Sequence, residues 1–401
     1  MKFAHMADCH IGSWRDPKLR DASTKAFSKA IDICLEEDVD FVLIAGDLFN
    51  TALPGVDLLK SVVAKLKELK DKGIPVYGIA GSHDFSPSGK TMIDVLENAG
   101  LFVNVCRGKV EDKKLVLEFT TNEKTGVKIT GMLGKRGMLD RKFYEQLDSK
   151  SLERENGRKV FLFHTLLSEL KPKDLQMMDS SPLSLLPKGF DYYAGGHPHF
   201  VLTKKEEGYG VIAYPGPLFP NSFKEMEDVK IGGFNIVEDW KIRHVNVQVY
   251  NVHNISVDCN HKTPEQVKAE ILEGIKNKEF IHTIVTIRLF GVLESGKVSD
   301  IDFGEISRML YEKSAFAVLR NTSGLSSKEF EEVKVSQGSV DEIEDRIIRE
   351  HAGQISIGLD RDKEITLTKK LIDALNMEKA EGERTSDFEA RVLETVRKVL
   401  E

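Results

Sequence analysis

The stretch IPVYGIAGSHDF, residues 74–85, decides how this chain is expected to fold, because an apolar run stops at a glycine followed by polar side chains. The run IPVYGIA has the continuous apolar character of a strand buried on both faces, as in a parallel sheet. Gly81 permits a tight turn, which delivers Ser82, His83 and Asp84 at the end of the strand. Polar groups at such a strand end indicate a reaction centre.

Length and composition are typical of a globular protein with several domains. At 401 residues the chain is too long for a single core, so two or three domains are expected. The net charge of −7 argues against a pure nucleic-acid coat, but not against an enzyme whose metals and local cations attract nucleic acid. The four cysteines form no C-x-x-C pair, and no apolar run reaches the roughly 18 residues of a membrane span. We therefore expect a cytoplasmic protein with reduced thiols and no targeting signal.

Three regions follow from the order of apolar patterns. In residues 1–250, buried strands such as FVLIAGDLF first alternate with amphipathic helices, which predicts a largely parallel sheet. Later strands of this region lack long intervening helices, which favours two sheets packed face to face with helices outside. Residues 251–335 repeat helix and strand in a smaller α/β unit, and residues 336–401 form a charge-rich helical tail. The predicted fold class is therefore α/β, with a two-layer β-sandwich core flanked by helices.

Candidate ligands cluster where apolar runs stop. Five of the eleven histidines and three acids occupy such positions. Two of the motifs, D-x-H and H-x-H, place two donors on the same side of a strand end. Since the carboxyl ends of parallel strands converge on one edge, all these donors are expected to meet in one place. In chain order they are Asp8, His10, Asp47, His83, Asp84, His164, His197 and His199.

Each of these signals has a simpler structural explanation when it is taken alone. A single histidine at a strand end is more often a hydrogen-bonded structural residue, and Asp47 or Asp84 could cap a turn or a helix. The two paired motifs have few structural uses, and the complete ordered set is specific. The sequence therefore favours a reaction centre over a coincidence of structural residues.

The ordered motifs resemble those of the calcineurin-like metallophosphoesterases, which implies a two-layer α/β sandwich with a two-metal site. Carried over by position, the resemblance assigns one metal to Asp8, His10 and His199. It assigns the other metal to His164 and His197, with Asp47 bridging both. Imidazole and carboxylate donors without a thiolate suit manganese, iron or zinc rather than a structural zinc cage.

Two neighbouring residues carry further expectations from the resemblance. Ser82 stands where the family usually has an asparagine ligand, so the second metal site is expected to form but to bind more weakly. His83 would not be a ligand but would protonate the leaving oxygen or stabilise the charge of the phosphorane. Asp84 would orient His83, or would instead cap the next helix.

The segments AGDLFNTALP (45–54) and YPGPLFPNSFKEMEDVKIGGF (214–234) are similar to those of SbcD-type double-strand-break repair nucleases, which include the meiotic-recombination-eleven nucleases. This resemblance implies a manganese-dependent DNA exo- and endonuclease, with residues 251–335 as a DNA-capping domain. The chain departs from that pattern at Asn50, where nucleases often carry histidine, and in PLFPNSF, which lacks charged residues common in the family. Both departures bear on exonuclease activity rather than on phosphodiester cleavage.

Two other functions remain open from the sequence. One is a nucleotide or small-molecule phosphodiesterase, although such a substrate needs neither the α/β unit nor the tail. The other is a non-catalytic DNA-repair scaffold with a weakened second metal site, as Ser82 would suggest.

The resemblance also implies partners. DNA would bind near the active edge, with Arg15, Arg20, Lys135 and Arg136 as candidate contacts, although such cations are often only solvated surface. A homodimer in the prokaryotic cytoplasm, associated with the nucleoid, is expected. The tail would dock on a Rad-fifty (SbcC-type) coiled-coil ATPase, unless it folds back on the α/β unit. The apolar residues expected to make that contact are Leu371, Leu375, Phe388, Val392 and Val396.

Overall fold

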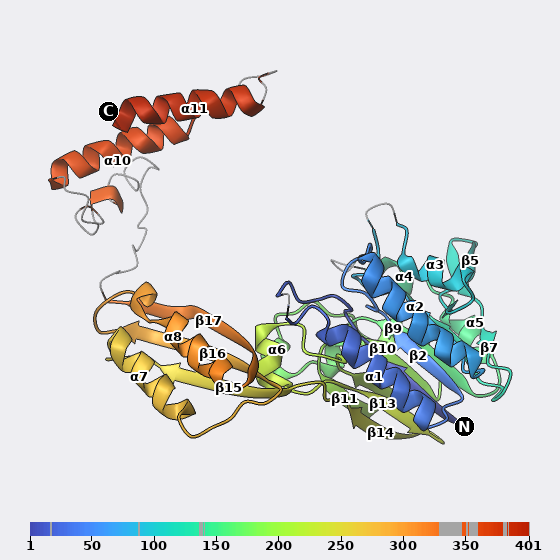
Figure 1. Cartoon of the computed structure of the whole chain (residues 1–401). Coiled ribbons are helices and arrows are strands. Elements are labelled where there is room, and N and C mark those ends of the chain that lie inside the picture. The colour runs from blue at the N-terminus through green and yellow to red at the C-terminus, as the bar shows by residue number, and fades with distance from the viewer. Residues whose placement is uncertain are drawn as a thin grey trace. The chain divides into compact units, whose positions relative to one another are not determined.

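The computed structural model describes residues 1–16, 18–86, 89–135, 139, 141–328, 347–349, 352, 360–379, 383 and 385–400 (Figure 1). The chain falls into two compact units, Met1–Ser327 and Lys328–Glu401. None of the helices in the described ranges is long and apolar enough to cross a membrane. All of the predicted metal ligands lie in the first unit, so its architecture determines the site.

The first sheet of this unit has six strands, and its central strands run parallel. The strand β1 pairs with β2 in parallel and with β13 antiparallel, and β2, β3 and β4 continue in parallel. Every residue of β2 is buried, as its uninterrupted apolar sequence FVLIA predicts for a central parallel strand. In spatial order the strands are β14 (Lys241–Asn246), β13 (Gly233–Glu238), β1 (Lys2–Met6), β2 (Phe41–Ala45), β3 (Val76–Ile79) and β4 (Val103–Asn104).

The second sheet also has six strands, with four parallel strands between two antiparallel edge strands. The edge strand β11 was not expected from the sequence, because VLTKK is polar and largely exposed and therefore lacks a buried-strand pattern. The strands in spatial order are β11 (Val201–Lys205), β12 (Val211–Pro215), β10 (Tyr192–Gly196), β9 (Lys159–His164), β8 (Lys128–Gly131) and β7 (Thr120–Thr121). A separate hairpin joins β5 (Gly108–Glu111) and β6 (Lys114–Leu117).

The two sheets pack face to face over a buried apolar layer, which confirms the predicted sandwich. The Phe3 ring from β1 stacks on Phe41 from β2, with ring centroids 4.9 Å apart. The same ring meets Tyr192 of the second sheet edge-on at 5.3 Å. This aromatic group therefore joins the sheets directly.

Helices cover the outer faces of both sheets and complete a four-layer arrangement. The outer face of the first sheet packs against α1 (Ala22–Glu36), α2 (Val56–Asp71) and α3 (Met92–Asn98). The second sheet is covered by α4 (Arg141–Glu145), α5 (Ser149–Arg154) and short 3₁₀ turns. The helices α1 and α2 lie between successive strands of the first sheet, where the sequence predicts amphipathic helices.

Residues 251–327 add a third sheet of three parallel strands, here called the β15–β17 unit. Its strands are β15 (Asn251–Asp258), β16 (Thr283–Leu293) and β17 (Ala315–Ser327), and α7 (Pro264–Ile275) and α8 (Phe303–Glu312) pack on one face. The Tyr250 ring stacks on Phe316 of β17 at 4.1 Å. This unit is part of the first compact unit, so the predicted boundary at residue 250 stays a prediction.

The second compact unit contains α10 (Arg361–Leu375) and α11 (Thr385–Leu400), which pack against each other. Four of the apolar residues predicted to contact a partner are half-buried, namely Leu371, Phe388, Val392 and Val396. The large apolar side chains that are exposed among the described residues of these two helices are Leu375, Leu393 and Leu400.

We predict that Phe3→Ala destabilises the first unit by about 3–5 kcal/mol, because it removes a fully buried ring and leaves a cavity between the sheets. The measurement is the free energy of unfolding from urea denaturation. Val110→Ala, at a side chain that is 74% exposed, is the control and should change that free energy by less than about 0.5 kcal/mol. A similarly small effect of Phe3→Ala would contradict the packing described here.

Candidate metal centre

The carboxyl ends of strands from both sheets meet at one edge of the sandwich and bring the predicted ligands together. Nε2 of His10, after β1, lies 3.2 Å from Nε2 of His199, after β10. It also lies 3.5 Å from Oδ2 of Asp47, after β2. Nε2 of His164, at the end of β9, is 3.1 Å from the same oxygen. The His197 ring lies beside that of His164, with centroids 5.3 Å apart.

Two carboxylates from the first sheet receive groups from the second. The Asp47 carboxylate contacts His164 of the second sheet, and it also accepts a 3.3 Å hydrogen bond from the hydroxyl of Ser82, which follows β3 of the first sheet. Asp8 accepts the backbone N–H of His197 at 3.0 Å and faces Nε2 of His199 at 3.8 Å. Each carboxylate therefore links the two sheets at this edge.

Much of the cluster is built on strained backbone. Four of the predicted ligands have positive φ, namely Asp8 (50°), His10 (41°), Asp47 (52°) and His197 (93°). Such left-handed conformations cost about 1–3 kcal/mol each in residues other than glycine, and they gather where function requires them. The surrounding fold holds these side chains in positions that a relaxed loop would not supply.

Gly196 lets the two sheets approach each other beside His164. A Cβ at this position would lie 2.1 Å from the carbonyl oxygen of Ala45 and 2.8 Å from Nδ1 of His164. That imidazole nitrogen donates to the same Ala45 carbonyl at 2.8 Å, which leaves Nε2 directed at Asp47. Glycine is therefore required where β10 passes β2.

The two carboxylates are buried, with exposed fractions of 0% for Asp8 and 1% for Asp47. Within the described ranges, their ion-pair partners are histidines and not lysine or arginine. Burial raises the pKa of Asp8 to about 6. Burial alone would also raise the pKa of Asp47, but the adjacent His164 holds that pKa below its usual range.

The histidines divide into two electrostatic groups. Burial lowers the pKa of His10 to about 3 and the pKa of His197 to about 4, so both present lone pairs. Burial also opposes the charged form of His164, but Asp47 raises its pKa to about 10. The pKa of His199 is raised to about 9 despite burial, because Glu225 and Asp8 stabilise its charged form. The positive charges of these two protonated imidazoles compensate the negative charges of the buried carboxylates.

The cluster fits divalent cations. The side chains of Asp8, His10 and His199 offer ligand atoms within 4.8 Å of one another, and so do Asp8, Asp47 and His164. Nitrogen and oxygen donors without thiolate suit manganese, iron or zinc. The Nε2 atoms of His10 and His199 face each other and can share only one proton, whereas one cation can accept both lone pairs.

The contacts of His83 and Asp84, which follow β3, agree only in part with the roles expected from the sequence. Nδ1 of His83 donates to the backbone carbonyl of Asn50 at 2.9 Å. The Asp84 carboxylate instead accepts the backbone N–H groups of Phe49 at 3.1 Å and Gly81 at 2.9 Å. The expectation that Asp84 orients His83 or caps the next helix is therefore wrong: Thr91 caps that helix, and Asp84 holds the turn. Burial raises the pKa of Asp84 to about 7.

Sequence reasoning missed Glu225, which hydrogen-bonds a predicted ligand. Its Oε1 lies 3.0 Å from Nδ1 of His199. It lies on α6 (Phe223–Asp228), where the Ser222 side chain caps the helix by accepting the Glu225 N–H. The pattern S-x-x-E over residues 222–225 is a capping-box signature and could have located this helix start.

The residues predicted to contact DNA differ from one another in their exposure to solvent. Arg15 and Arg20 are exposed. Lys135 is half-buried, and its Nζ lies over the rings of Phe143 and Phe85 at 5.0 and 5.6 Å from their centroids. Arg136 lies outside the described residues.

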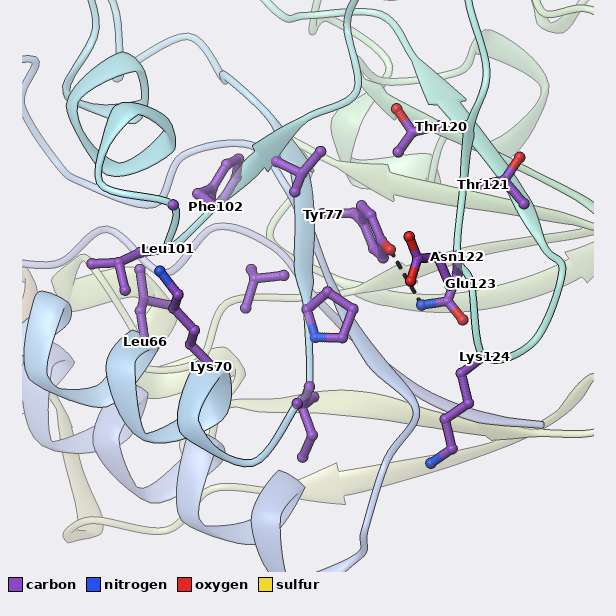
Figure 2. Close-up of a pocket in the computed structure, with 16 residues that line it drawn as sticks. Leu66, Lys70, Tyr77, Leu101, Phe102, Thr120, Thr121, Asn122, Glu123 and Lys124 are labelled. Carbon is purple, nitrogen blue, oxygen red and sulfur yellow. Dashed lines mark hydrogen bonds between the residues drawn. The ribbon is translucent and has the colours of Figure 1, made fainter.

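Two cavities differ in their relation to the cluster. A cavity of about 820 Å³ opens directly beside it, and its lining includes His10, His83 and His199 as well as apolar residues such as Phe200 and Met178. A second cavity, of about 540 Å³, surrounds the beginning of β3, where Tyr77 accepts a hydrogen bond from Asn122 (Figure 2). No predicted site residue lines this second cavity, so of these two cavities the first is the one that borders the cluster.

Comparisons with known proteins agree with this arrangement. The family described as calcineurin-like phosphoesterase matches residues 1–200. The chain is 27% identical over 362 residues to the DNA double-strand break repair protein Mre11 of Archaeoglobus fulgidus, covering 84% of this chain and 77% of that protein. The Methanococcus maripaludis protein of the same name is 26% identical over 314 residues, covering 72% and 79%. That of Methanopyrus kandleri is 31% identical over 251 residues, covering 59% and 54%.

Metal binding near neutral pH is expected to release protons. The pKa values of His164 and His199, raised to about 10 and about 9, keep both protonated at about pH 7.5, and a metal ion requires their lone pairs. Metal affinity should therefore increase as the pH rises toward those values. Calorimetric titration of Mn²⁺ in buffers of different ionisation enthalpy should count about two protons per chain.

His164→Gln is the matched variant for this titration. Because glutamine cannot be protonated, this variant should release about one proton fewer per chain when Mn²⁺ binds. A binding enthalpy that is the same in every buffer would show that metal binding displaces no protons from these histidines and would contradict the prediction.

Proposed function

Residues 1–200 of this chain are a calcineurin-like phosphoesterase domain, and we propose that the chain, a metal-dependent phosphodiesterase, acts as a DNA double-strand-break repair nuclease. The observation that carries the proposal is the position of Asp47. One of its oxygens lies 3.5 Å from the His10 imidazole and 3.1 Å from that of His164, which suits a bridge between two ions. The name shared by the relatives supports DNA as the substrate.

We assign the ligands as two half-sites. Asp8, His10 and His199 would hold one ion, and His164 and His197 the other, with Asp47 between them. Ser82 would act on the second ion through its hydrogen bond to Asp47, so that ion is expected to bind more weakly. When bound, two such ions lower the pKa of water and neutralise charge on a phosphodiester during in-line displacement.

His83 is proposed as the general acid. Since a carbonyl can only accept a hydrogen bond, the contact with Asn50 holds one proton on Nδ1, and the second proton of the imidazolium, on Nε2, would be the one donated to the leaving oxygen. His83 lines the cavity beside the cluster, where a scissile phosphate would enter. Asp84 supports this role indirectly by fixing the turn from Gly81 onward.

Manganese is the proposed metal, and both exo- and endonuclease activity are proposed. Arg15 and Arg20 are the candidate contacts for the DNA backbone, because exposed guanidinium groups near the active edge attract phosphates. Asn50 contributes its backbone carbonyl to His83, and a role for its side chain in exonuclease activity is not proposed. The enzyme would act in the cytoplasm of a prokaryote, at the nucleoid.

The test of this function is a manganese-dependent assay on linear duplex DNA, single-stranded DNA and a chromogenic phosphodiester. We expect cleavage of all three, and His83→Ser should reduce the turnover number by about 10²- to 10⁴-fold, the usual loss for a positioned acid. Both ions should remain bound in calorimetry.

His261→Ser, which changes a histidine whose side chain is 84% exposed, is the control and should leave turnover unchanged. Loss of a metal ion in His83→Ser would instead make His83 a ligand, as its position within 4.8 Å of ligand atoms of His10 and Asp47 would allow. Activity confined to the chromogenic ester would favour a small-molecule phosphodiesterase, and no activity would favour a scaffold.

We further propose that the tail binds a Rad-fifty-type ATPase and that the nuclease is a homodimer. The helices α10 and α11 form a small unit that is compact apart from residues 1–327. Exposed Leu375, Leu393 and Leu400 supply apolar surface of the kind that lies in a partner's groove.

Deleting residues 361–401 is expected to abolish co-purification with the ATPase of the same organism and to leave manganese-dependent cleavage intact, since the deleted helices belong to the separate unit. Leu393→Glu and Leu400→Glu in the full-length chain test the apolar contact without truncation. Normal ATPase binding by the truncated chain would contradict the proposal.

A further inference from the structure

Helix α6 lies between the two-sheet sandwich and the β15–β17 unit (Figure 1). It has six residues, Phe223–Asp228, and its central Met226 is fully buried. Residues two apart on a helix point about 200° away from each other, so Glu225 and Glu227 face opposite sides. The helix therefore offers two separate carboxylates to two separate parts of the fold.

One side of α6 contacts the metal centre. Glu225 accepts the Nδ1 proton of His199 at 3.0 Å, which leaves Nε2 directed at Nε2 of His10. The carboxylate is held in turn by the backbone N–H of Asn221 at 2.9 Å and by the Ser222 hydroxyl at 3.1 Å. Glu225 thus fixes the tautomer and direction of His199, and it is itself fixed by the start of α6.

The other side of α6 contacts the β15–β17 unit. Arg288 of β16 donates from Nε to Oε1 of Glu227 at 2.8 Å and from Nη2 to Oε2 at 2.5 Å. Its guanidinium also lies 5.2 Å from the centroid of the Phe223 ring. Asn254 of β15 donates to the backbone carbonyl of Glu227 at 3.1 Å. Two parallel strands therefore hold both the side chain and the backbone of one residue in α6.

We propose that α6 couples the position of the β15–β17 unit to the metal site that contains His199. Glu225 is a positioning residue for His199, and the pair between Glu227 and Arg288 sets the position of Glu225. A change at Arg288, which belongs to a different sheet from every predicted ligand, then alters the affinity for one ion and not for the other. This inference rests on the proposed two-metal function.

The physical basis is geometric. The second hydrogen bond of a ligating histidine fixes its orientation, and loss of such a partner usually costs 10- to 100-fold in metal affinity. A bidentate guanidinium–carboxylate pair resists rotation as well as separation, so it is suited to fix the helix that carries this partner. The side chains of Glu227 and Arg288 are 16% and 32% exposed, so water competes only partly with the pair.

The experiment is calorimetric titration of Mn²⁺ into the full-length chain and its variants. Glu225→Ala should weaken one of two binding events by about 10- to 100-fold, and Glu225→Gln should recover much of that loss because its amide oxygen can accept the same proton. Arg288→Ala should weaken the same event by about fivefold or more. The charge swap of Glu227→Arg with Arg288→Glu should restore it.

Lys268→Ala is the matched control. It breaks a 2.9 Å ion pair with Glu305 inside the same unit, at a similar exposed fraction of 29%, without touching α6. At saturating Mn²⁺ the turnover number of Arg288→Ala on a chromogenic phosphodiester should return to the wild-type value, because only metal affinity has changed.

If Arg288→Ala and Lys268→Ala bind Mn²⁺ with equal affinities, the coupling is overturned. The coupling is also overturned if the charge-swap variant folds but binds Mn²⁺ as weakly as Arg288→Ala. If the wild-type chain binds two ions and Glu225→Ala binds them equally well, Glu225 does not position His199. A wild-type chain that binds no Mn²⁺ would overturn the proposed function itself, which is a different result from unchanged variants.

Discussion

The burial of Asp8 and Asp47 between two sheets is the constraint on which the rest of this structure depends. A buried carboxylate is costly unless it is paired and hydrogen-bonded, and among the described residues these two are paired only with histidines. The closest of the pairing groups come from the opposite sheet, since His164 reaches Asp47 and the backbone of His197 reaches Asp8. The two sheets must therefore keep the same position relative to each other at this edge. The contact between the Phe3 and Tyr192 rings, in the apolar layer between the sheets, holds that relative position.

Local strain follows from the same constraint. Asp8, His10 and Asp47 leave their strands in left-handed conformations, which turn the side chains inward at a cost in backbone energy. Asp84 contributes to holding this geometry rather than to the chemistry, because its carboxylate accepts N–H groups from Phe49 and Gly81 and joins two neighbouring strand ends. The strands, the left-handed residues that follow them and the buried hydrogen bonds together hold the metal-ligating side chains in place before any ion binds.

The core fold and the cluster could be predicted from sequence because both depend on local patterns. Apolar runs that end in acids or histidines mark central parallel strands, and such strands bring their carboxyl ends to one edge. Glu225 could not be assigned in this way, because its partner His199 is 26 residues away and the contact exists only once α6 has docked. The strand β11 was missed for a different reason, since it is an exposed edge strand and has no apolar pattern. Likewise, the role of Asp84 depends on the distance between two strand ends, which the sequence does not contain.

Substrate choice has to arise outside the cluster. Imidazoles and carboxylates around two cations recognise the charge of a phosphodiester but not the groups that the phosphate joins, so the same ligand set can serve many substrates. Two features surround the cluster: a cavity whose lining includes apolar residues such as Phe200 and Met178, and a helix held from the β15–β17 unit. Because α6 contacts both His199 and that unit, residues outside the cluster are linked by hydrogen bonds to a predicted metal ligand. Under the coupling proposed above, a substitution in the β15–β17 unit changes the affinity for a metal ion without touching any ligand of that ion.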